Sequence, residues 1–416
     1  MFNKLFTRPD TIVHHQTAPL AGERLAYLNH LAGQGSAFKS LCQTAPYLLR
    51  ITDRLRLNKP PDRMVSVTEI KQAADQWAVR RKKGRYHKPG ACSKGRFVSI
   101  ATRWLEFMGR LKHRPKPESR FEPWLSEFDN YMHNERGLSP VTRSGRRWVV
   151  SRFLDRTVTS GKDPTSLTIA DVDKYFQTLG NQDGYSRASL LVVAGCLRAF
   201  FRYGATRDWW RKGIAEAIKS PRVYSLDSLP SGPSWTDVKR LLALTEGDDP
   251  TAIRDRAILM LLAIYGLRAG EVIRLRLDDF DWKDELLSVT CSKSKKQRVF
   301  PLSRSVGDAV LRYLTEARPR TTHRKLFLTL YAPIHPLRAL GHVVGKRLRR
   351  LGVSITHYGP HCLRHACATH LLAEGLSLKQ IGDQLGHGDP ATSLIYAKVD
   401  IAGLRQVANF DLGELL

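Results

Sequence analysis

The chain has 416 residues, more than one ordinary hydrophobic core accommodates, so we expect two or three domains. With 42% hydrophobic and 9% aromatic residues, its composition is that of a globular protein and excludes a disordered chain. Lysine and arginine number 67 against 39 acidic residues, which gives a net charge of +28 that is spread along the chain without a single basic tail. This charge favours a polyanionic partner, and nucleic acid is the commonest one.

An anionic membrane surface is the alternative partner. No apolar run approaches the roughly 20 residues that span a bilayer, and no basic amphipathic anchor stands out. The N-terminal sequence lacks the apolar core and cleavage site of a signal peptide. The six cysteines are scattered without a CxxC pair, which is typical of reduced thiols in the cytosol. We therefore expect a cytoplasmic, nucleoid-associated protein that has no membrane partner.

Residues 1–118 are basic and mostly helical. Apolar periodicity predicts helices over 23–33, 47–57, 65–79 and 96–111, and Ser66 or Thr68 could cap the third. The basic segment between the last two is a solvated loop or a phosphate contact. The sequence HRPKP at 113–117 cannot sustain a helix and is read as a linker.

Residues 119–222 repeat this order of signals. Helices are predicted over 122–137, 140–158, 166–180 and 186–205, with Gly137 ending the first and Ser139 capping the second. VSVTEIKQAADQWA matches LTIADVDKYFQTLG at an offset of 102, pairing Glu69 with Asp171 (171 − 69 = 102). Two explanations stay open: a tandem duplication of one four-helix module, or the patterning that any two helical bundles share.

A proline- and serine-rich linker at 223–233 precedes the last predicted domain, 234–416, which includes a C-terminal tail. Helices are predicted over 234–245 and 249–275, the second interrupted at Gly266 and Gly270. The β-type runs at 286–289 and 299–300 flank a turn rich in lysine and serine, which predicts a β-hairpin. Helices are predicted again over 303–317, over 334–352 and through 357–396.

Four local signals in this last domain suit phosphoryl transfer without a metal. Such chemistry needs fork-shaped cations for the non-bridging oxygens, a nucleophile, and an acid for the leaving group. The chain offers no HExxH, EF-hand loop or P-loop. It does offer an arginine at a glycine-broken helix junction, a lysine on the hairpin turn, an HxxR pair, and a histidine followed by a tyrosine. These residues are Arg268 with Glu271, Lys293, His361 with Arg364, His387 and Tyr396.

This ordered set resembles the tyrosine recombinases, the superfamily of phage integrases and chromosome-dimer resolvases. The resemblance covers residues 230–416, and the helical module before them resembles the family's core-binding domain. It implies a mainly α fold with a small β-sheet: an α+β catalytic domain that follows one or more helical N-terminal DNA-binding domains. Where many members read GKGNKER, this chain reads SKSKKQR, so Lys295 and Lys296 stay open as alternatives to Lys293.

The resemblance also implies roles. Tyr396 would attack the scissile phosphate to give a 3′-phosphotyrosyl link and a free 5′-hydroxyl. Two arginines would hold the phosphate, and Lys293 would protonate the leaving oxygen. The complete set is Tyr396 as nucleophile, His361 as base or phosphate hydrogen-bonder, Arg268 and Arg364 as phosphate ligands, His387 as a further donor, Lys293 as acid and Glu271 as an orienting residue.

Partners follow from the same resemblance: double-stranded DNA with specific recombination sites, a homotetramer on DNA with a dimer on each site, and C-terminal tails exchanged between protomers. Accessory recombinases are a further expectation, and no cofactor is expected. Residues on the hairpin and on the helix at 140–158 are candidate DNA contacts: Lys295, Lys296, Arg298, Arg143, Arg146 and Arg147.

Three other interpretations are weighed against this one. Zinc could use the cluster of histidines and cysteines between 361 and 387, but the spacing lacks the CxxC-like pairs of structural zinc sites, so no metal is expected. Cys362 and Cys367 are more simply small residues of a buried helix. A DNA-binding protein with reduced catalysis would keep the fold, whereas here every catalytic position is occupied. A topoisomerase or telomere resolvase would share the chemistry, and an integrase of a mobile element is favoured.

Overall fold

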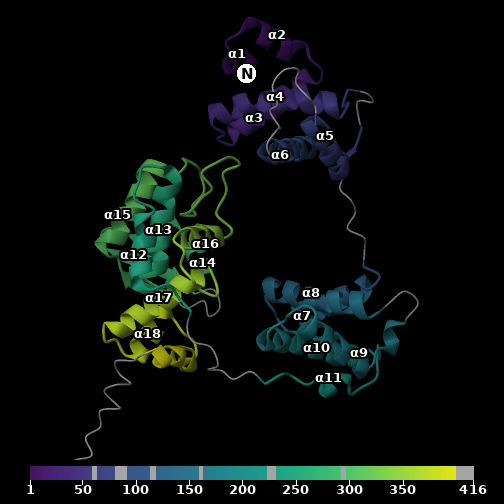
Figure 1. Cartoon of the computed structure of the whole chain (residues 1–416), viewed down its shortest axis with the longest axis vertical. Coiled ribbons are helices and arrows are strands. Elements are labelled where there is room, and N and C mark those ends of the chain that lie inside the picture. Colours follow the sequence, from purple (N-terminus) through teal and green to yellow (C-terminus); the bar gives the residue numbers. More distant parts are fainter. Residues whose placement is uncertain are drawn as a thin grey trace, which may run out of the picture. The chain divides into compact units, whose positions relative to one another are not determined.

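The computed structural model describes residues 1–58, 63–79, 91–112, 119–158, 163–222, 231–291 and 297–399. Contacts between Cα atoms divide the chain into two compact units, one made of Met1–Lys112 and Leu229–Leu416 and the other of His113–Ser228. Figure 1 follows the elements of both along the chain. Each cluster of buried apolar side chains stays within one of the predicted domains. The predicted domain boundaries themselves stay a prediction.

The N-terminal segment, Met1–Lys112, is helical. Four helices carry most of its core, and Ser66 caps the third of them because its hydroxyl accepts the N–H of Glu69. Arg24 is fully buried and donates to the carbonyl oxygens of His15, Ala18 and Pro19, which fixes the turn between two helices. The elements are α1 (Phe2–Leu5), α2 (Pro9–Thr17), α3 (Ala21–Gly33), α4 (Phe38–Arg54), α5 (Val67–Val79) and α6 (Ala91–Phe107), with β1 (Val65–Ser66) parallel to β2 (Leu111–Lys112).

The second unit is a bundle built around one aromatic-rich core. Ser139 caps its second helix as predicted, and Gly137 has a positive φ of 58°. Its last long helix, Arg187–Thr206, has the length and hydropathy of a candidate membrane span, although its inner face forms this core. The elements are α7 (Glu122–Asn134), α8 (Pro140–Thr157), η1 (Pro164–Ser166), α9 (Ile169–Asn181), α10 (Arg187–Thr206) and α11 (Ile214–Ala217).

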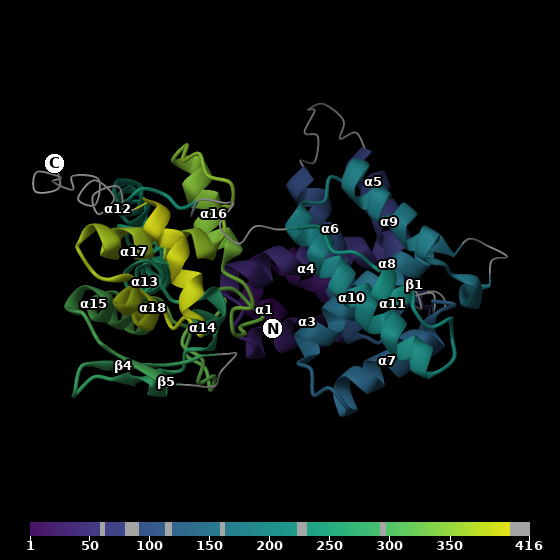
Figure 2. The same ribbon diagram turned by 90° about the horizontal axis from the view of Figure 1, so that it is seen from below.

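Residues 231–399 combine helices with a three-stranded antiparallel sheet, which confirms the predicted α+β class. The sheet order is β3-β4-β5, with Leu287 opposite Phe300, so the predicted hairpin is confirmed and is visible in Figure 2. The elements are α12 (Trp235–Ala243), α13 (Pro250–Ile264), α14 (Ala269–Arg274), η2 (Leu277–Asp279), β3 (Phe280–Asp281), β4 (Leu286–Thr290), β5 (Gln297–Pro301), α15 (Arg304–Arg312), η3 (Tyr313–Ala317), α16 (Gly341–Arg350), α17 (Pro360–Ala373), α18 (Leu378–Leu385) and η4 (Pro390–Val399).

The predicted interruption of helix 249–275 is half right. The chain leaves α13 at Gly266, whose φ is +60° and where a Cβ atom would come within 2.4 Å of Leu385. Gly270 lies inside α14 and interrupts nothing. The helix predicted over 334–352 is too long, because its helical part begins at Gly341. The break after α13 matters because it directs the chain back toward α18.

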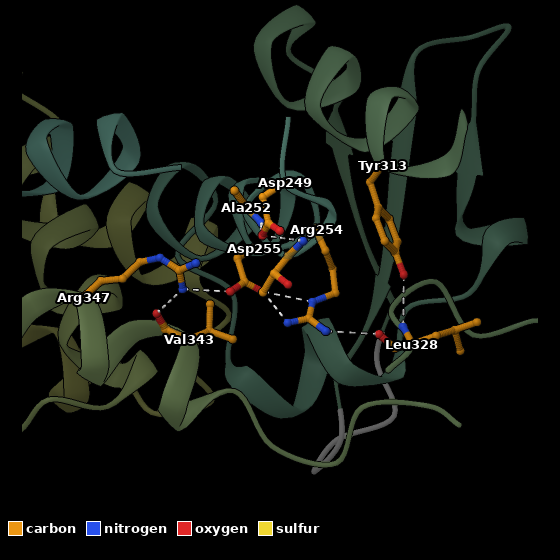
Figure 3. A network of polar contacts seen from close by, with 9 residues as sticks. Asp249, Ala252, Arg254, Asp255, Tyr313, Leu328, Val343 and Arg347 are labelled. Atoms are coloured by element: carbon orange, nitrogen blue, oxygen red, sulfur yellow. Dashed lines mark hydrogen bonds and ion pairs between the residues drawn. The ribbon is translucent and has the colours of Figure 1, made fainter. Parts of the chain in front are cut away.

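A buried polar network holds α13 to α16 (Figure 3). The Asp255 side chain is only 3% exposed; its Oδ1 accepts from Arg254, and its Oδ2 lies 2.8 Å from Arg347 on α16. Arg254 also donates to the carbonyl oxygen of Leu328. One carboxylate therefore neutralises part of the charge of two guanidinium groups that are mostly out of water.

We predict that Asp255→Ala destabilises the protein by roughly 3 kcal/mol or more, because it leaves buried guanidinium charge without its counterion. The matched control is Asp248→Ala, which removes a carboxylate that is 98% exposed and pairs with Arg312. The control should cost less than about 1 kcal/mol. Thermal unfolding followed by circular dichroism checks both variants, and equal shifts in the two would contradict the assignment.

Candidate active site

Three arginines from three elements meet at the C-terminal end of α18. Arg298 of β5 donates to the carbonyl oxygen of Gln384 at 2.8 Å, Arg364 of α17 to that of Leu385 at 2.7 Å, and Arg268, just before α14, to that of Gly386 at 3.1 Å. The last carbonyls of a helix lack partners within it and carry the negative end of its dipole. The arginines therefore satisfy these carbonyls and are themselves held in place.

Gly386 makes this convergence possible. It ends α18 in the left-handed conformation, with φ +67°, and a Cβ atom there would lie 2.9 Å from the guanidinium carbon of Arg298. Any side chain at this position would push Arg298 away from the helix end. His387 is the next residue, so the same turn fixes the backbone position from which its imidazole extends.

Glu271 is the counterion of the cluster. Its side chain is fully buried, accepts the backbone N–H of Arg268, and forms ion pairs with Arg268 at 3.1 Å and with Arg298 at 3.0 Å. Three guanidinium groups against one carboxylate leave a charge of +2 (3 − 1) at the end of α18. Burial, and then the neighbouring charge of Arg268, lowers the pKa of Arg364 to about 10. An anion bound at this place would offset the surplus positive charge.

Two histidines border the cluster. His361 lies on the exposed first turn of α17, and partial burial lowers its pKa, with the charges of Arg364 and Arg268 acting in the same direction. Burial, followed by the same two arginines, lowers the pKa of His387 to about 4, and its Nδ1 lies 2.7 Å from the hydroxyl of the buried Ser393. Both imidazoles are therefore neutral near pH 7 and act as hydrogen-bonding groups.

Tyr396 lies in the 3-10 helix η4 and is only 2% exposed. Its ring packs in a small core with Cys367 and Leu385, and its hydroxyl is 3.1 Å from Nδ1 of His365. Burial raises its pKa to about 12, an effect that the charge of Arg364 partly offsets. The phenol is thus held neutral against an imidazole whose own pKa burial lowers to about 4.

The predicted residues of the catalytic set that the structure describes lie together. Arg268 and Arg364 both donate to carbonyls at the end of α18, the ring centroids of His361 and its neighbour His365 are 4.5 Å apart, and those of His387 and Tyr396 are 6.5 Å apart. Lys293, Lys295 and Lys296 lie outside the described residues.

The candidate DNA contacts behave differently. Arg298 forms an ion pair with Glu271 and donates to the carbonyl oxygen of Gln384. These internal contacts favour a supporting role in the site over contact with DNA. Arg143 and Arg147 of α8 form ion pairs with Asp129 and Glu122. Arg146 is partly exposed on the same helix. These three belong to the other unit.

His365 and Ser393 were not predicted for these places. His365 belongs to the histidine and cysteine cluster that was weighed as a zinc site and rejected, and the structure places its Nδ1 3.1 Å from the Tyr396 hydroxyl. Ser393 carries no signal beyond its position six residues after His387. Among the residues that the structure describes, no group of three or more potential ligands could hold a metal ion. Cys362 and Cys367 are buried core residues, as predicted.

Comparisons with known proteins agree with this geometry. Residues 235–402 match the Phage integrase family, and residues 124–211 match the N-terminal SAM-like domain of phage integrases. The putative integrase/recombinase y4rA of Sinorhizobium fredii (strain NBRC 101917 / NGR234) is 35% identical over 72% of each chain. Tyrosine recombinase XerA of Thermococcus kodakarensis (strain ATCC BAA-918 / JCM 12380 / KOD1) is 34% identical over 68% of this chain and 93% of its own.

A solved structure of the Tn1549 transposon integrase with transposon right end DNA shares the fold. It superposes with a TM-score of 0.55 at 18% identity, over 68% of this chain and 99% of its own. The chain belongs to the tyrosine recombinases of the phage integrase family. The family expected from the sequence is therefore confirmed, and with it the class of site-specific recombinase.

We predict that Gly386→Ala destabilises the protein by about 1–2 kcal/mol from backbone conformation alone, and further as Arg298 is displaced. The matched control is Gly388→Ala, two residues later, where a Cβ atom would meet nothing within 4 Å. Thermal unfolding midpoints compare the two variants. A loss no larger in the first variant than in the control would show that the turn tolerates a side chain.

The histidine pKa values predict acid sensitivity. His365 binds its proton near pH 4 in the folded protein and near 6.5 when unfolded. The unfolded chain therefore binds more protons between these values, and stability falls as pH is lowered from 6.5 to 4. His15 and His387 carry the same shift, and the pKa of His361 is lowered as well, so His365→Gln should remove between about a quarter and a third of the histidine contribution to this slope.

The slope is measured as the thermal unfolding midpoint against pH, with His323→Gln as the control because His323 is an exposed loop residue of the same unit. The control should keep the wild-type slope. Identical slopes for His365→Gln and wild type would contradict the burial of a neutral imidazole beside Tyr396.

Proposed function

We propose that this chain is a site-specific DNA recombinase, an integrase, that cuts and rejoins DNA through a 3′-phosphotyrosyl intermediate formed by Tyr396. The observation that carries the proposal is the surplus of two positive charges at the end of α18, close to a phenol held by an imidazole. Fixed guanidinium groups suit the extra negative charge that a phosphate acquires during displacement. This chemistry uses neither a metal nor ATP.

Arg268 and Arg364 are the proposed ligands of the non-bridging oxygens. The exposure of Arg268 supports this role. Its side chain is 35% exposed, although its two terminal nitrogens already contact Glu271 and the carbonyl oxygen of Gly386. Arg364 is buried, so its positive charge would act on the phosphate from inside the protein. His387, neutral and anchored to Ser393, would donate to the same phosphate. Glu271 would orient both Arg268 and Arg298 and take no part in bond making.

Tyr396 has to leave its buried position before it can react. Its hydroxyl lies against His365, and its pKa of about 12 disfavours the phenolate. Movement of η4 would bring the oxygen to the arginines, whose charge stabilises a phenolate. A neutral imidazole can accept the phenol proton, and His361 or His365 would do so.

The reaction then proceeds by exchange at phosphorus. The tyrosine oxygen forms a bond to phosphorus as the bond to the 5′-oxygen breaks, and Lys293 would give a proton to that oxygen. The 5′-hydroxyl of a partner strand next attacks the phosphotyrosine and releases Tyr396. One phosphodiester is made for each one broken, so no energy source is needed.

Double-stranded DNA with specific recombination sites is the proposed partner, in a homotetramer with a dimer on each site. Exchange of C-terminal tails is part of this proposal, and the tail at 400–416 lies outside the described residues. The protein would act on DNA in the cytoplasm, and accessory recombinases could join it. An origin in a mobile element is supported by the names of its relatives, among them putative integrases and a transposon integrase.

We predict that Tyr396→Phe still binds DNA but forms no covalent adduct, because the attacking oxygen is gone. The substrate is a nicked suicide duplex built from inverted repeats that flank the coding gene, and adducts are resolved on a denaturing gel. Tyr331→Phe is the control, since Tyr331 is a well-exposed tyrosine of the same unit and should leave the adduct at the wild-type level.

An adduct that persists in Tyr396→Phe would overturn the assignment of the nucleophile. Adding a second duplex separates the related activities. Joining of strands from the two duplexes identifies recombination, whereas hairpin formation without exchange identifies a resolvase, and relaxation of a separate supercoiled plasmid without exchange identifies a topoisomerase.

A further inference from the structure

The N-terminal segment, Met1–Lys112, has no assigned role. Neither matched family reaches it, because the matches cover residues 124–211 and 235–402. It nevertheless has its own hydrophobic core and presents four main helices, α3 to α6, in the same order as α7 to α10. The question is whether the two sets share only a helical character or a common register.

The middle of the two sets is in register at an offset of 102. Leu48 and Ile51 of α4 are fully buried, as are Val150 and Phe153 of α8 (150 − 48 = 102; 153 − 51 = 102). The next helix begins in each case with a reciprocal cap, in which a hydroxyl residue and an acidic residue bond to one another. These pairs are Ser66 with Glu69, and Thr168 with Asp171 (168 − 66 = 102).

The last helices are in register at an offset of 96. Four core positions of α6 correspond to four of α10, and all of them are buried: Phe97 with Val193, Ala101 with Leu197, Trp104 with Phe200, and Leu105 with Phe201 (193 − 97 = 96). The offset changes by six residues between the caps and these helices. The connection before α6 spans 80–90 and that before α10 spans 182–186, which is 11 residues against 5, and accounts for the change.

The start of each set agrees as well. Gly35 and Gly137 both follow the first helix with a positive φ, of 82° and 58° (137 − 35 = 102). Two unrelated bundles would share apolar faces, but not caps, turns and core positions at a spacing of 102 that changes once, by the length of one connection, to 96. This register favours duplication of one module over the patterning common to helical bundles.

The two copies differ in net charge. Residues 1–112 contain 21 basic and 7 acidic residues, a net charge of +14 (21 − 7) and half of the total of +28. Residues 113–222 contain 19 basic and 12 acidic residues, a net charge of +7 (19 − 12). The first copy is therefore the most basic part of the chain, although no catalytic residue lies in it.

The described part of this charge includes a surface of arginines on aromatic rings. Arg50 of α4 lies over Tyr47 at 5.7 Å and over Trp77 of α5 at 5.6 Å, while Arg96 of α6 lies over Tyr47 at 5.9 Å. Both arginines are exposed, and among the described residues neither forms an ion pair; Arg96 donates only to the amide oxygen of Gln43. Stacking holds such guanidinium groups in place while leaving their N–H groups free for an anion.

The second copy uses the matching arginine differently. Arg152 stands at the position of Arg50 (152 − 50 = 102), and it too lies over two rings, those of Trp148 and Tyr185. It is ion-paired with Asp183 at 2.9 Å, so part of its charge is neutralised within the module. In the first copy, no residue that the structure describes supplies such a counterion to Arg50.

We propose that Met1–Lys112 is a second copy of the SAM-like module and that its arginine–aromatic surface (Arg50, Arg96, Tyr47 and Trp77) binds the phosphate backbone of duplex DNA. Unpaired, pre-positioned guanidinium groups match phosphate oxygens, and each contact releases a counterion. The surface adds a DNA contact that is independent of the chemistry at Tyr396. It would extend the length of DNA that one protomer holds.

The test measures the salt dependence of DNA binding by the full-length chain. Arg50→Gln/Arg96→Gln is compared with Lys4→Gln/Arg8→Gln, which removes the same charge from α1 and from the residue before α2. Binding to a fluorescent random-sequence duplex is followed by anisotropy between 50 and 300 mM KCl. The slope of log K against log salt should fall by roughly 2 in the first variant, about 0.9 for each lost phosphate contact.

The control should keep the wild-type slope, because it changes the long-range field but not a contact. Arg50→Lys/Arg96→Lys should restore most of the slope, since lysine also binds phosphate, and this separates contact from misfolding. Equal slopes in the Gln variant and the control would overturn the proposal. So would a Gln variant that binds DNA normally but loses binding to phosphatidylserine-containing vesicles. The adduct assay on Tyr396 is separate, so either proposal can fail without the other.

Discussion

The contact on which the rest of the catalytic unit depends is the grip of three guanidinium groups on the last carbonyls of α18. Arg268, Arg298 and Arg364 come from a loop, a strand and a helix, and Arg268 is 118 residues away from the carbonyl that it binds. The last carbonyls of the helix need donors, and the arginines need acceptors. Each group therefore satisfies the other. Because His387 follows this turn and Tyr396 packs beside it, both functional groups inherit their positions from the same contact.

Holding three guanidinium groups at one helix end is electrostatically unfavourable in the free protein, and the same arrangement favours the binding of an anion. Burying like charges is unfavourable unless they are paired, and here Glu271 offsets one of three. The site is therefore poised to gain stability from an anion, and a ligand that binds only the folded state stabilises it. Burial, and then the same positive charge, lowers the pKa values of His361 and His387 and keeps both imidazoles neutral, so they can hydrogen-bond to a phosphate without adding further repulsion.

Local patterns were sufficient for elements and for residues that act on one helix face. The hairpin, the Ser139 cap and the position of His361 and Arg364 on one helix, α17, follow from neighbours a few residues apart. What could not be predicted depends on partners far along the chain. The role of His365 depends on the placement of α17 beside η4, and Arg298 reads as a candidate DNA contact until β5 is placed beside α18. Gly266 and Gly270 read alike in sequence, and the positive φ of Gly266 together with the close approach of Leu385 distinguishes them.

The two helical modules extend this contrast between core and surface. Their buried positions stay aligned because packing tolerates only residues of suitable size, whereas their exposed charges have no such constraint. Arg50 and Arg152 keep the same stacked place, yet one is neutralised by Asp183 and the other is open to solvent. Under the duplication proposed above, one acidic residue decides whether the stacked arginine is ion-paired within its module. We propose that the arginine cluster at the end of α18 binds one DNA phosphate and that the Arg50–Arg96 surface binds further phosphates of the same DNA.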